Sequence, residues 1–264
     1  MNRSHLTMTA LAAALAMALP GCSREGTDAP QPTPAPAADS PGAARRTGAP
    51  DSPAPNRGAT RRVPEFKGLI VRGSFVVEVR VGAGAGDDVE LHIEAPPDQL
   101  ARVFTTIVDD SLTIMHEPGG RFSTPPTISF TVADLTTVTT AGSSQIRITG
   151  VDNESLRLTS LGSGAAEVEG RTDSFNVHIA GSAEVTLRGQ ARRFDLDCSG
   201  SGAVRAKDLR VEEAGLDISG SGRVELCVTG TLDASVSGSG EVSYFCDPAQ
   251  VTPRISGAGR VGPG

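Results

Sequence analysis

The chain has 264 residues and a formal net charge of −7, from 24 Lys and Arg against 31 Asp and Glu. Because nucleic-acid binding depends on basic side chains that neutralise phosphates, this balance argues against a nucleic-acid partner. Aromatic residues make up only 3% of the chain, which leaves few of the rings that stack against sugars or bases. The four His residues are scattered without zinc-ligand spacing, so the composition predicts neither a metal nor a cofactor.

The N-terminus predicts export. A short positive start around Arg3 is followed by an Ala- and Leu-rich apolar stretch, residues 6–19, that is too short to span a membrane as a mature helix. The tetrad Leu19-Pro20-Gly21-Cys22 resembles the bacterial lipobox, in which the peptide is cut before a Cys that is then lipidated. We therefore expect a lipoprotein signal peptide over residues 1–21 and a lipid on Cys22.

The residue after this Cys bears on the destination. Ser23 stands where an Asp would suggest inner-membrane retention, which favours the outer membrane as the site of the anchor. The alternative is an ordinary signal peptide that releases a soluble product.

Residues 22–62 are expected to be a lipidated Cys followed by a disordered tether rich in Pro and Ala. From residue 23 to 62 the chain contains no Val, Ile, Leu, Met or aromatic residue, but eight of its 18 prolines. Such a segment cannot bury enough apolar surface to order itself, and its prolines favour extended conformations.

The sequence of residues 63–135 predicts an all-β region that precedes the repeat described below. Gly, Pro and Asp turns separate its strands. The expected strands are 69–71, 75–81, 89–93, 103–108, 112–116 and 128–132. We interpret this region as an N-terminal cap, continuous with the elements that follow it, because the open end of a stack of strands needs to be covered. A separately folding domain is the alternative.

From residue 136 to 264 the chain is a repeat. Seven copies begin with Gly and two small residues, and in six of them a β-branched apolar residue follows at the fourth position after the Gly. The copies start at Gly142, Gly162, Gly181, Gly200, Gly220, Gly238 and Gly257. Apolar residues alternate on both sides of each Gly, which is the strand period, and no helical pattern intervenes. The repeat predicts an all-β, parallel β-solenoid of about 19 residues per coil.

The glycines of the repeat are expected to be structural. A corner between two strands needs positive φ or close backbone approach, which Gly tolerates at the least cost. A phosphate-binding loop would need a following helix, which the pattern does not contain.

Outward-facing positions carry two charge patterns. On one side, opposite charges alternate between neighbouring coils, as in Arg147 with Glu167, Arg205 with Glu225, and Arg223 with Glu241, which would help to set the register. On the other side, polar groups gather and define a candidate binding face, made of Glu154, Arg157, His178, Asp195, Asp197 and Asp217. Two stacked carboxylates there could bind a hard cation or act as an acid/base pair, and the alternative is a solvated surface strand.

The cysteines follow the period of the repeat. Cys227 and Cys246 lie 19 residues apart, which would stack them about 5 Å apart and within reach of a disulfide. Because their offsets from the local Gly differ by one residue, free thiols remain the alternative. Cys198 occupies an inward slot that is otherwise filled by Ile or Val, so we expect a buried, inert thiol.

Four segments together resemble a known family: residues 66–73 (FKGLIVRG) before 75–79 (FVVEV), the strand 111–114 (SLTI), the Gly-Ser-Gly repeats, and the closing 244–248 (YFCDP). They are similar to the head GIN domain of putative auto-transporter adhesins. The resemblance implies a β-helical fold and an adhesin-like role, with no catalytic or binding residue to carry over. That family usually has Gly where this chain has Cys246.

Three classes of function fit these features. The first is an exported, lipid-anchored envelope protein that presents the solenoid to a protein or glycan ligand without catalysis. The second is a structural envelope protein that self-associates end to end, and the third, the least favoured, is a polysaccharide-active β-helix enzyme.

Overall fold

The computed structural model describes residues 57–82, 88–117 and 122–264, all of which lie in one compact unit, residues 50–264. Apart from one helical turn, α1 (Pro97–Leu100), the regular elements of these residues are strands. The predicted signal peptide and most of the predicted tether lie outside the described residues.

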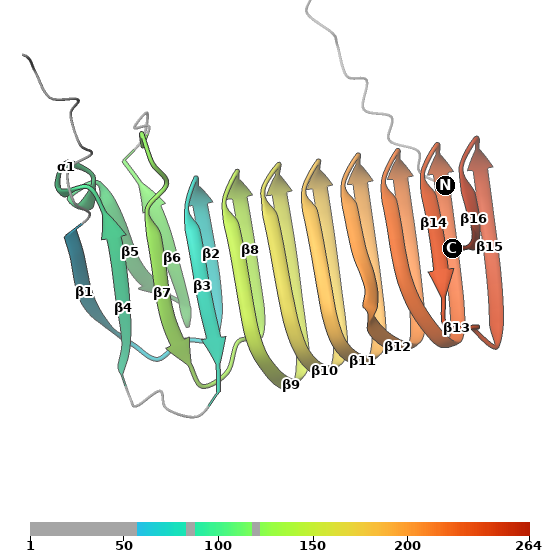
Figure 1. Cartoon of the computed structure of the whole chain (residues 1–264), viewed down its shortest axis with the longest axis horizontal. Helices are drawn as coiled ribbons and strands as arrows, with labels where there is room; N and C mark the ends of the chain where they lie inside the picture. The colour runs from blue at the N-terminus through green and yellow to red at the C-terminus, as the bar shows by residue number, and fades with distance from the viewer. Residues whose placement is uncertain (1–56, 83–87, 118–121) are drawn as a thin grey trace, which may run out of the picture. The chain divides into compact units, whose positions relative to one another are not determined.

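The repeat forms a parallel stack of coils (Figure 1). Most of it is made of long strands that bend from one side of the stack to the other. They are β9 (Gln145–Gly162), β10 (Ala165–Gly181), β11 (Glu184–Gly200), β12 (Ala203–Gly220) and β13 (Arg223–Gly238). The stack begins with β8 (Thr137–Gly142) and ends with β14 (Glu241–Phe245), β15 (Gln250–Gly257) and β16 (Arg260–Pro263).

Each coil contributes one strand segment before its tip Gly and one after it. The segments before the Gly form a pre-tip layer, and the segments after it form a post-tip layer. Successive tip glycines are register partners, as in Gly162 with Gly181 and Gly181 with Gly200. This arrangement confirms the predicted parallel β-solenoid and its period of about 19 residues.

The tip glycines are required by the stacking itself. Gly238 has φ +119°, and a Cβ added there would lie 2.6 Å from the carbonyl oxygen of Gly220 in the coil before it. That carbonyl oxygen also accepts a hydrogen bond from the backbone N–H of Ser239, at 2.8 Å. A side chain at the tip would therefore be strained by its own backbone and would push the two coils apart.

An eighth tip lies in the cap. Gly73 is the register partner of Gly142, has φ +124°, and accepts a hydrogen bond from Ser143 N–H at 3.0 Å. The short sequence Gly73-Ser74 therefore belongs to the same column as the seven repeats, although the repeat pattern alone does not reveal it.

The cap is built from seven further strands: β1 (Arg57–Pro64), β2 (Gly68–Gly73), β3 (Val76–Val81), β4 (Asp88–Ala95), β5 (Val103–Val108), β6 (Ser111–His116) and β7 (Thr127–Val132). β1 lies at the end of the sheet beside β4, but the next two strands, β2 and β3, lie further inward. β2 lies between β6 and β8, and β3 lies between β7 and β9. The chain thus moves outward through β4 to β7 and then returns past β2 and β3 to continue at β8.

β1 corrects one boundary. The segment 57–62, expected to be part of the tether, is strand: β1 pairs antiparallel with β4 along its whole length. The pairing depends on backbone hydrogen bonds and therefore does not need the large apolar side chains that this segment lacks. Arg62 adds an ion pair to Glu90 at 2.8 Å, and Arg61 Nη1 donates to Thr105 Oγ1 at 3.0 Å.

One hydrophobic core runs through the cap and the solenoid, from Phe66 to Val242. Inward positions carry Val, Ile, Leu and Phe in columns, and Phe175 packs edge to face on Phe194 with their ring centroids 6.1 Å apart. Burying a side chain such as Phe194 stabilises the fold by about 1.5–3 kcal/mol. The cap is therefore continuous with the solenoid.

Cys227 and Cys246 form a disulfide, with their Cα atoms 5.1 Å apart. The register partner of Cys227 is Phe245, one residue earlier than Cys246. Cys246 reaches its partner because its backbone is left-handed, with φ +71°, a conformation that Gly adopts more readily than other residues. Cys198 is free and buried, and its burial raises the pKa of the thiol.

The tip column predicts a large difference between two Gly→Ala substitutions. Gly238→Ala should destabilise the protein by more than about 2 kcal/mol, because left-handed backbone costs an L-residue roughly 1–2 kcal/mol before the clash with the Gly220 carbonyl is counted. Gly58→Ala is the control, since an added Cβ there meets nothing within 4 Å. Equal urea midpoints for the two variants would contradict the role of the column.

The disulfide predicts a second change in stability. The double variant Cys227→Ser/Cys246→Ser should lose roughly 3 kcal/mol, because the bridge limits the unfolded chain and holds the last coils together. A reductant should then destabilise the wild type but not the variant. Peptide mapping of the non-reduced protein should recover the 227–246 pair, and recovery of a bridge to Cys198 would contradict the register of the C-terminal coils.

Candidate binding groove

The candidate site lies on the outer side of the pre-tip layer. Because the coils pair in parallel register, outward residues at the same distance from their tip Gly line up in a column. One column, three residues before each Gly, reads Thr159, His178, Asp197, Asp217, Ser235 and Arg254. The next, five residues before each Gly, reads Arg157, Asn176, Asp195, Gly215, Asp233 and Thr252.

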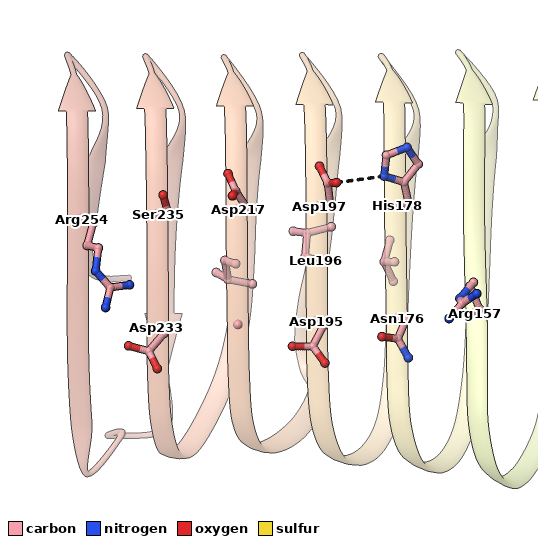
Figure 2. A pocket seen from close by; sticks show the side chains of 13 residues that line it. Arg157, Asn176, His178, Asp195, Leu196, Asp197, Asp217, Asp233, Ser235 and Arg254 are labelled. Atoms are coloured by element: carbon pink, nitrogen blue, oxygen red, sulfur yellow. Dashed lines mark ion pairs between the residues drawn. The ribbon is translucent and has the colours of Figure 1, made fainter. Parts of the chain in front are cut away.

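Between these columns the surface is hollowed into an open groove of about 470 Å³ (Figure 2). Gly215 accounts for part of the hollow, because it contributes no side chain between Asp195 and Asp233. A Cβ at Gly215 would lie 2.9 Å from Oδ1 of Asp195. Leu196 and Leu216, whose side chains are buried, complete the lining.

The middle of the groove is acidic and its ends are basic. Asp195, Asp197, Asp217 and Asp233 occupy the middle coils, while Arg157 and Arg254 lie at opposite ends of the row (Figure 2). We call this surface the acidic groove.

In the part of the chain that the structure describes, contacts with His or Arg side chains involve only two of these four carboxylates. His178 Nδ1 lies 3.3 Å from Asp197 Oδ2, and Arg193 Nε donates to Asp195 Oδ2 at 3.1 Å. Among the described residues, Asp217 and Asp233 have no cationic side chain within ion-pair distance. The register also places Asp217 beside Asp197, so two carboxylates of the same sign are neighbours.

The post-tip layer shows the opposite behaviour. Arg147 pairs with Glu167 at 2.7 Å, and Arg223 pairs with Glu241 at 3.3 Å, as the alternation of charges predicts. Arg205 differs from the prediction: Glu225 is its register neighbour, but its ion pair is with Glu184 on the other side. Charge on this layer is largely neutralised between coils, whereas the acidic groove keeps its charge.

The structure brings together five of the six predicted residues of the binding face, all but Glu154. The segment containing Glu154 connects the two layers, because β9 pairs with β3 up to Thr149 and with β8 only from Arg157. Glu154 therefore lies on the bend and does not line the groove.

Four polar groups of the groove were missed from the sequence: Asn176, Asp233, Ser235 and Arg254. All four lie three or five residues before a tip Gly, as the predicted residues from Arg157 to Asp217 do. These two offsets are therefore enough to identify them from the sequence. The hollow at Gly215 has no such signal, since it depends on the side chains of two neighbouring coils.

Within the described segments, no group of three or more His, Cys, Asp or Glu side chains is arranged to hold a metal ion. No helix in the same segments has the length and apolar character needed to cross a membrane.

The stacked tips and the two layers define a parallel β-solenoid with an N-terminal cap. The family described as putative auto-transporter adhesin, head GIN domain, matches residues 65–248, and the chain belongs to this family.

Solved structures agree with this fold. A putative adhesin from Bacteroides fragilis has a TM-score of 0.72 at 21% identity, covering 78% of this chain and 96% of that one. A putative lipid binding protein from Parabacteroides distasonis has a TM-score of 0.62 at 22% identity, with 78% and 96% covered. A putative adhesin from Parabacteroides merdae has a TM-score of 0.60 at 18% identity, with 80% and 96% covered.

No curated protein sequence matches the chain. Neither the description of the family nor the names of these three structures refer to an enzyme.

Proposed function

We propose that this protein is an exported, lipid-anchored protein of the cell envelope that uses its β-solenoid as a non-catalytic scaffold and binds a ligand in the acidic groove. The family description and the names of two similar structures, each called a putative adhesin, support an adhesin-like role at the envelope or the cell surface. The lipobox-like tetrad ending at Cys22 supports a lipid anchor, and Ser23 after it favours the outer membrane as the site of that anchor.

The observation that carries the proposal is the uncompensated charge of a preformed groove. Its side chains project from strands whose backbone is fixed by hydrogen bonds to both neighbouring coils. A rigid site loses little conformational freedom on binding, so more of the interaction energy appears as affinity. Asp217 and Asp233 lack a cationic partner among the described residues, so a ligand can supply it.

The shape and charge of the groove describe the ligand. The groove runs across the strands, from Arg157 to Arg254, and its acidic middle lies between basic ends. An extended chain with cationic groups at its centre complements this arrangement. A basic segment of a protein and a glycan that carries free amino groups both have this chemistry.

The groove predicts that a cationic probe binds and that two carboxylates carry the binding. Asp197→Asn/Asp217→Asn should weaken binding of an oligolysine peptide or a glucosamine oligosaccharide by about tenfold, which corresponds to about 1.4 kcal/mol. The melting temperature should stay unchanged or rise slightly, because the substitutions remove repulsion between neighbouring strands. Isothermal titration calorimetry measures the first effect and thermal unfolding the second.

A matched control separates the groove from the net charge. Asp173→Asn/Asp208→Asn removes the same two charges from exposed positions outside the groove and should bind either probe as the wild type does. Equal losses in the two double variants, or no binding of either probe to the wild type, would contradict the proposal.

The anchor predicts the result of fractionation. Cys22→Ser should release the protein from the membrane fraction or leave its signal uncleaved, and metabolic labelling with palmitate should be lost. Ser23→Ala keeps the Cys and should remain membrane-bound and labelled. Recovery of Cys22→Ser as a fully processed, membrane-bound protein would rule out the lipid anchor.

A further inference from the structure

The pre-tip layer ends at β5, whose strand partner among the described residues is β6. The sequence of β5, VFTTIV, carries no charge and no Pro. Its outward side chains Phe104 and Val108 are 50% and 56% exposed. They are two of the four large hydrophobic residues that are exposed in the described part of the chain. A β-rich, apolar edge strand is a surface on which another strand can pair.

We propose that β5 is a dimerisation edge, on which the β5 of a second copy of this chain pairs antiparallel about a two-fold axis at Thr106. Such an interface is isologous, since each copy uses the same strand. The inference is independent of the ligand proposed for the acidic groove.

The order of residues in β5 makes the strand complementary to itself. With Thr106 opposite Thr106 of the partner subunit, Phe104 lies opposite Val108 of the partner subunit, and the reverse pair follows by symmetry. Aromatic with β-branched and Thr with Thr are pairs that stabilise neighbouring antiparallel strands. On the inward side, Thr105 lies opposite Ile107 of the partner subunit, so the same register joins inward positions with inward ones.

The charges that flank β5 fit the same register. Arg102 comes directly before the strand, and the turn Asp109–Asp110 comes directly after it. Antiparallel pairing brings Arg102 alongside the Asp109–Asp110 turn of the partner subunit at both ends of the interface. Within its own chain Arg102 has a long ion pair, 3.9 Å to Glu117. Parallel pairing of the two strands would instead place like charges together at each end.

The other end of the stack is built differently. The terminal strands β15 and β16 contain Pro253 and Pro263, which lack an N–H, and the charged residues Arg254 and Arg260. Pro and charge are typical of edges that are protected against pairing. A two-fold contact at β5 also leaves neither copy with a free β5 edge. The expected product is therefore a closed dimer rather than a filament of coils stacked end to end.

The dimer would extend one sheet across both copies. The pre-tip layer of one copy would continue into that of the other through the two β5 strands, and the two acidic grooves would lie on that shared layer. A ligand with repeated cationic groups could then engage both grooves, and the second contact would raise the apparent affinity through a high effective concentration.

Sedimentation equilibrium tests the proposal. It uses the chain without its predicted signal peptide, residues 22–264, with Cys22→Ser so that no lipid is attached. An interface made of one six-residue strand from each copy is small, and small interfaces are typically weak. We therefore expect a monomer–dimer equilibrium with a Kd on the order of micromolar. Thr106→Lys puts two like charges opposite each other on the axis and should weaken the dimer at least tenfold. Thr231→Lys, at an exposed position of β13, should not change it. A monomer at every concentration, assemblies larger than two chains, or an unchanged dimer in Thr106→Lys would overturn the proposal.

A crosslink supplies a second readout that does not depend on weakening the dimer. Residues opposite each other in antiparallel strands have Cα atoms about 4.5–5.5 Å apart, within reach of a disulfide. Thr106→Cys should therefore give a disulfide-linked dimer under oxidising conditions, whereas Thr231→Cys should remain monomeric on a non-reducing gel. Folded Thr106→Cys protein that crosslinks no faster than Thr231→Cys would overturn the assigned axis.

Discussion

The contact between tip glycines of neighbouring coils is the constraint on which the rest of the structure depends. From Gly142 onward, each of these glycines has a left-handed backbone and lies against the carbonyl of the Gly in the coil before it, where a Cβ would clash. The next residue donates its N–H to that same carbonyl, as Ser201 does to Gly181 at 2.9 Å. Because this contact repeats in every coil, equal offsets from the tip become straight columns, and the acidic groove consists of two of these columns.

The columns of the two layers carry different patterns of charge. On the post-tip layer, Arg and Glu alternate between coils and neutralise one another, which favours the correct register through small stabilising contributions. On the pre-tip layer, Asp197 and Asp217 are neighbours of like charge, and their repulsion is tolerated because the core beneath them and the glycine tips already hold the coils. The stability of the solenoid therefore does not depend on the charges at the groove, and the groove can carry carboxylates that the fold does not need.

The part of the structure that repeats could be predicted from the sequence, because Gly spacing and period-two alternation are local signals that each coil carries by itself. Residues of the groove follow from the same offsets, including Asp233 and Arg254, which were overlooked. The path of the cap could not be predicted, since nothing local shows that β2 lies between β6 and β8 and that β3 lies between β7 and β9. β1 was also missed, because its stability comes from backbone pairing with β4 and its sequence resembles the tether. The hollow at Gly215 and the left-handed Cys246 likewise depend on contacts between coils.

Amide hydrogen exchange at the tips tests the stacking most directly. The N–H groups of Ser182, Ser201 and Ser221 donate to Gly162, Gly181 and Gly200 of the preceding coils, although these Ser residues are exposed at the edge of the stack. If the tips are stacked as described, these three amides exchange orders of magnitude more slowly than a free peptide, with protection close to that of the core strands. Exchange at the rate of a free peptide at these three positions, in an otherwise folded protein, would contradict the account.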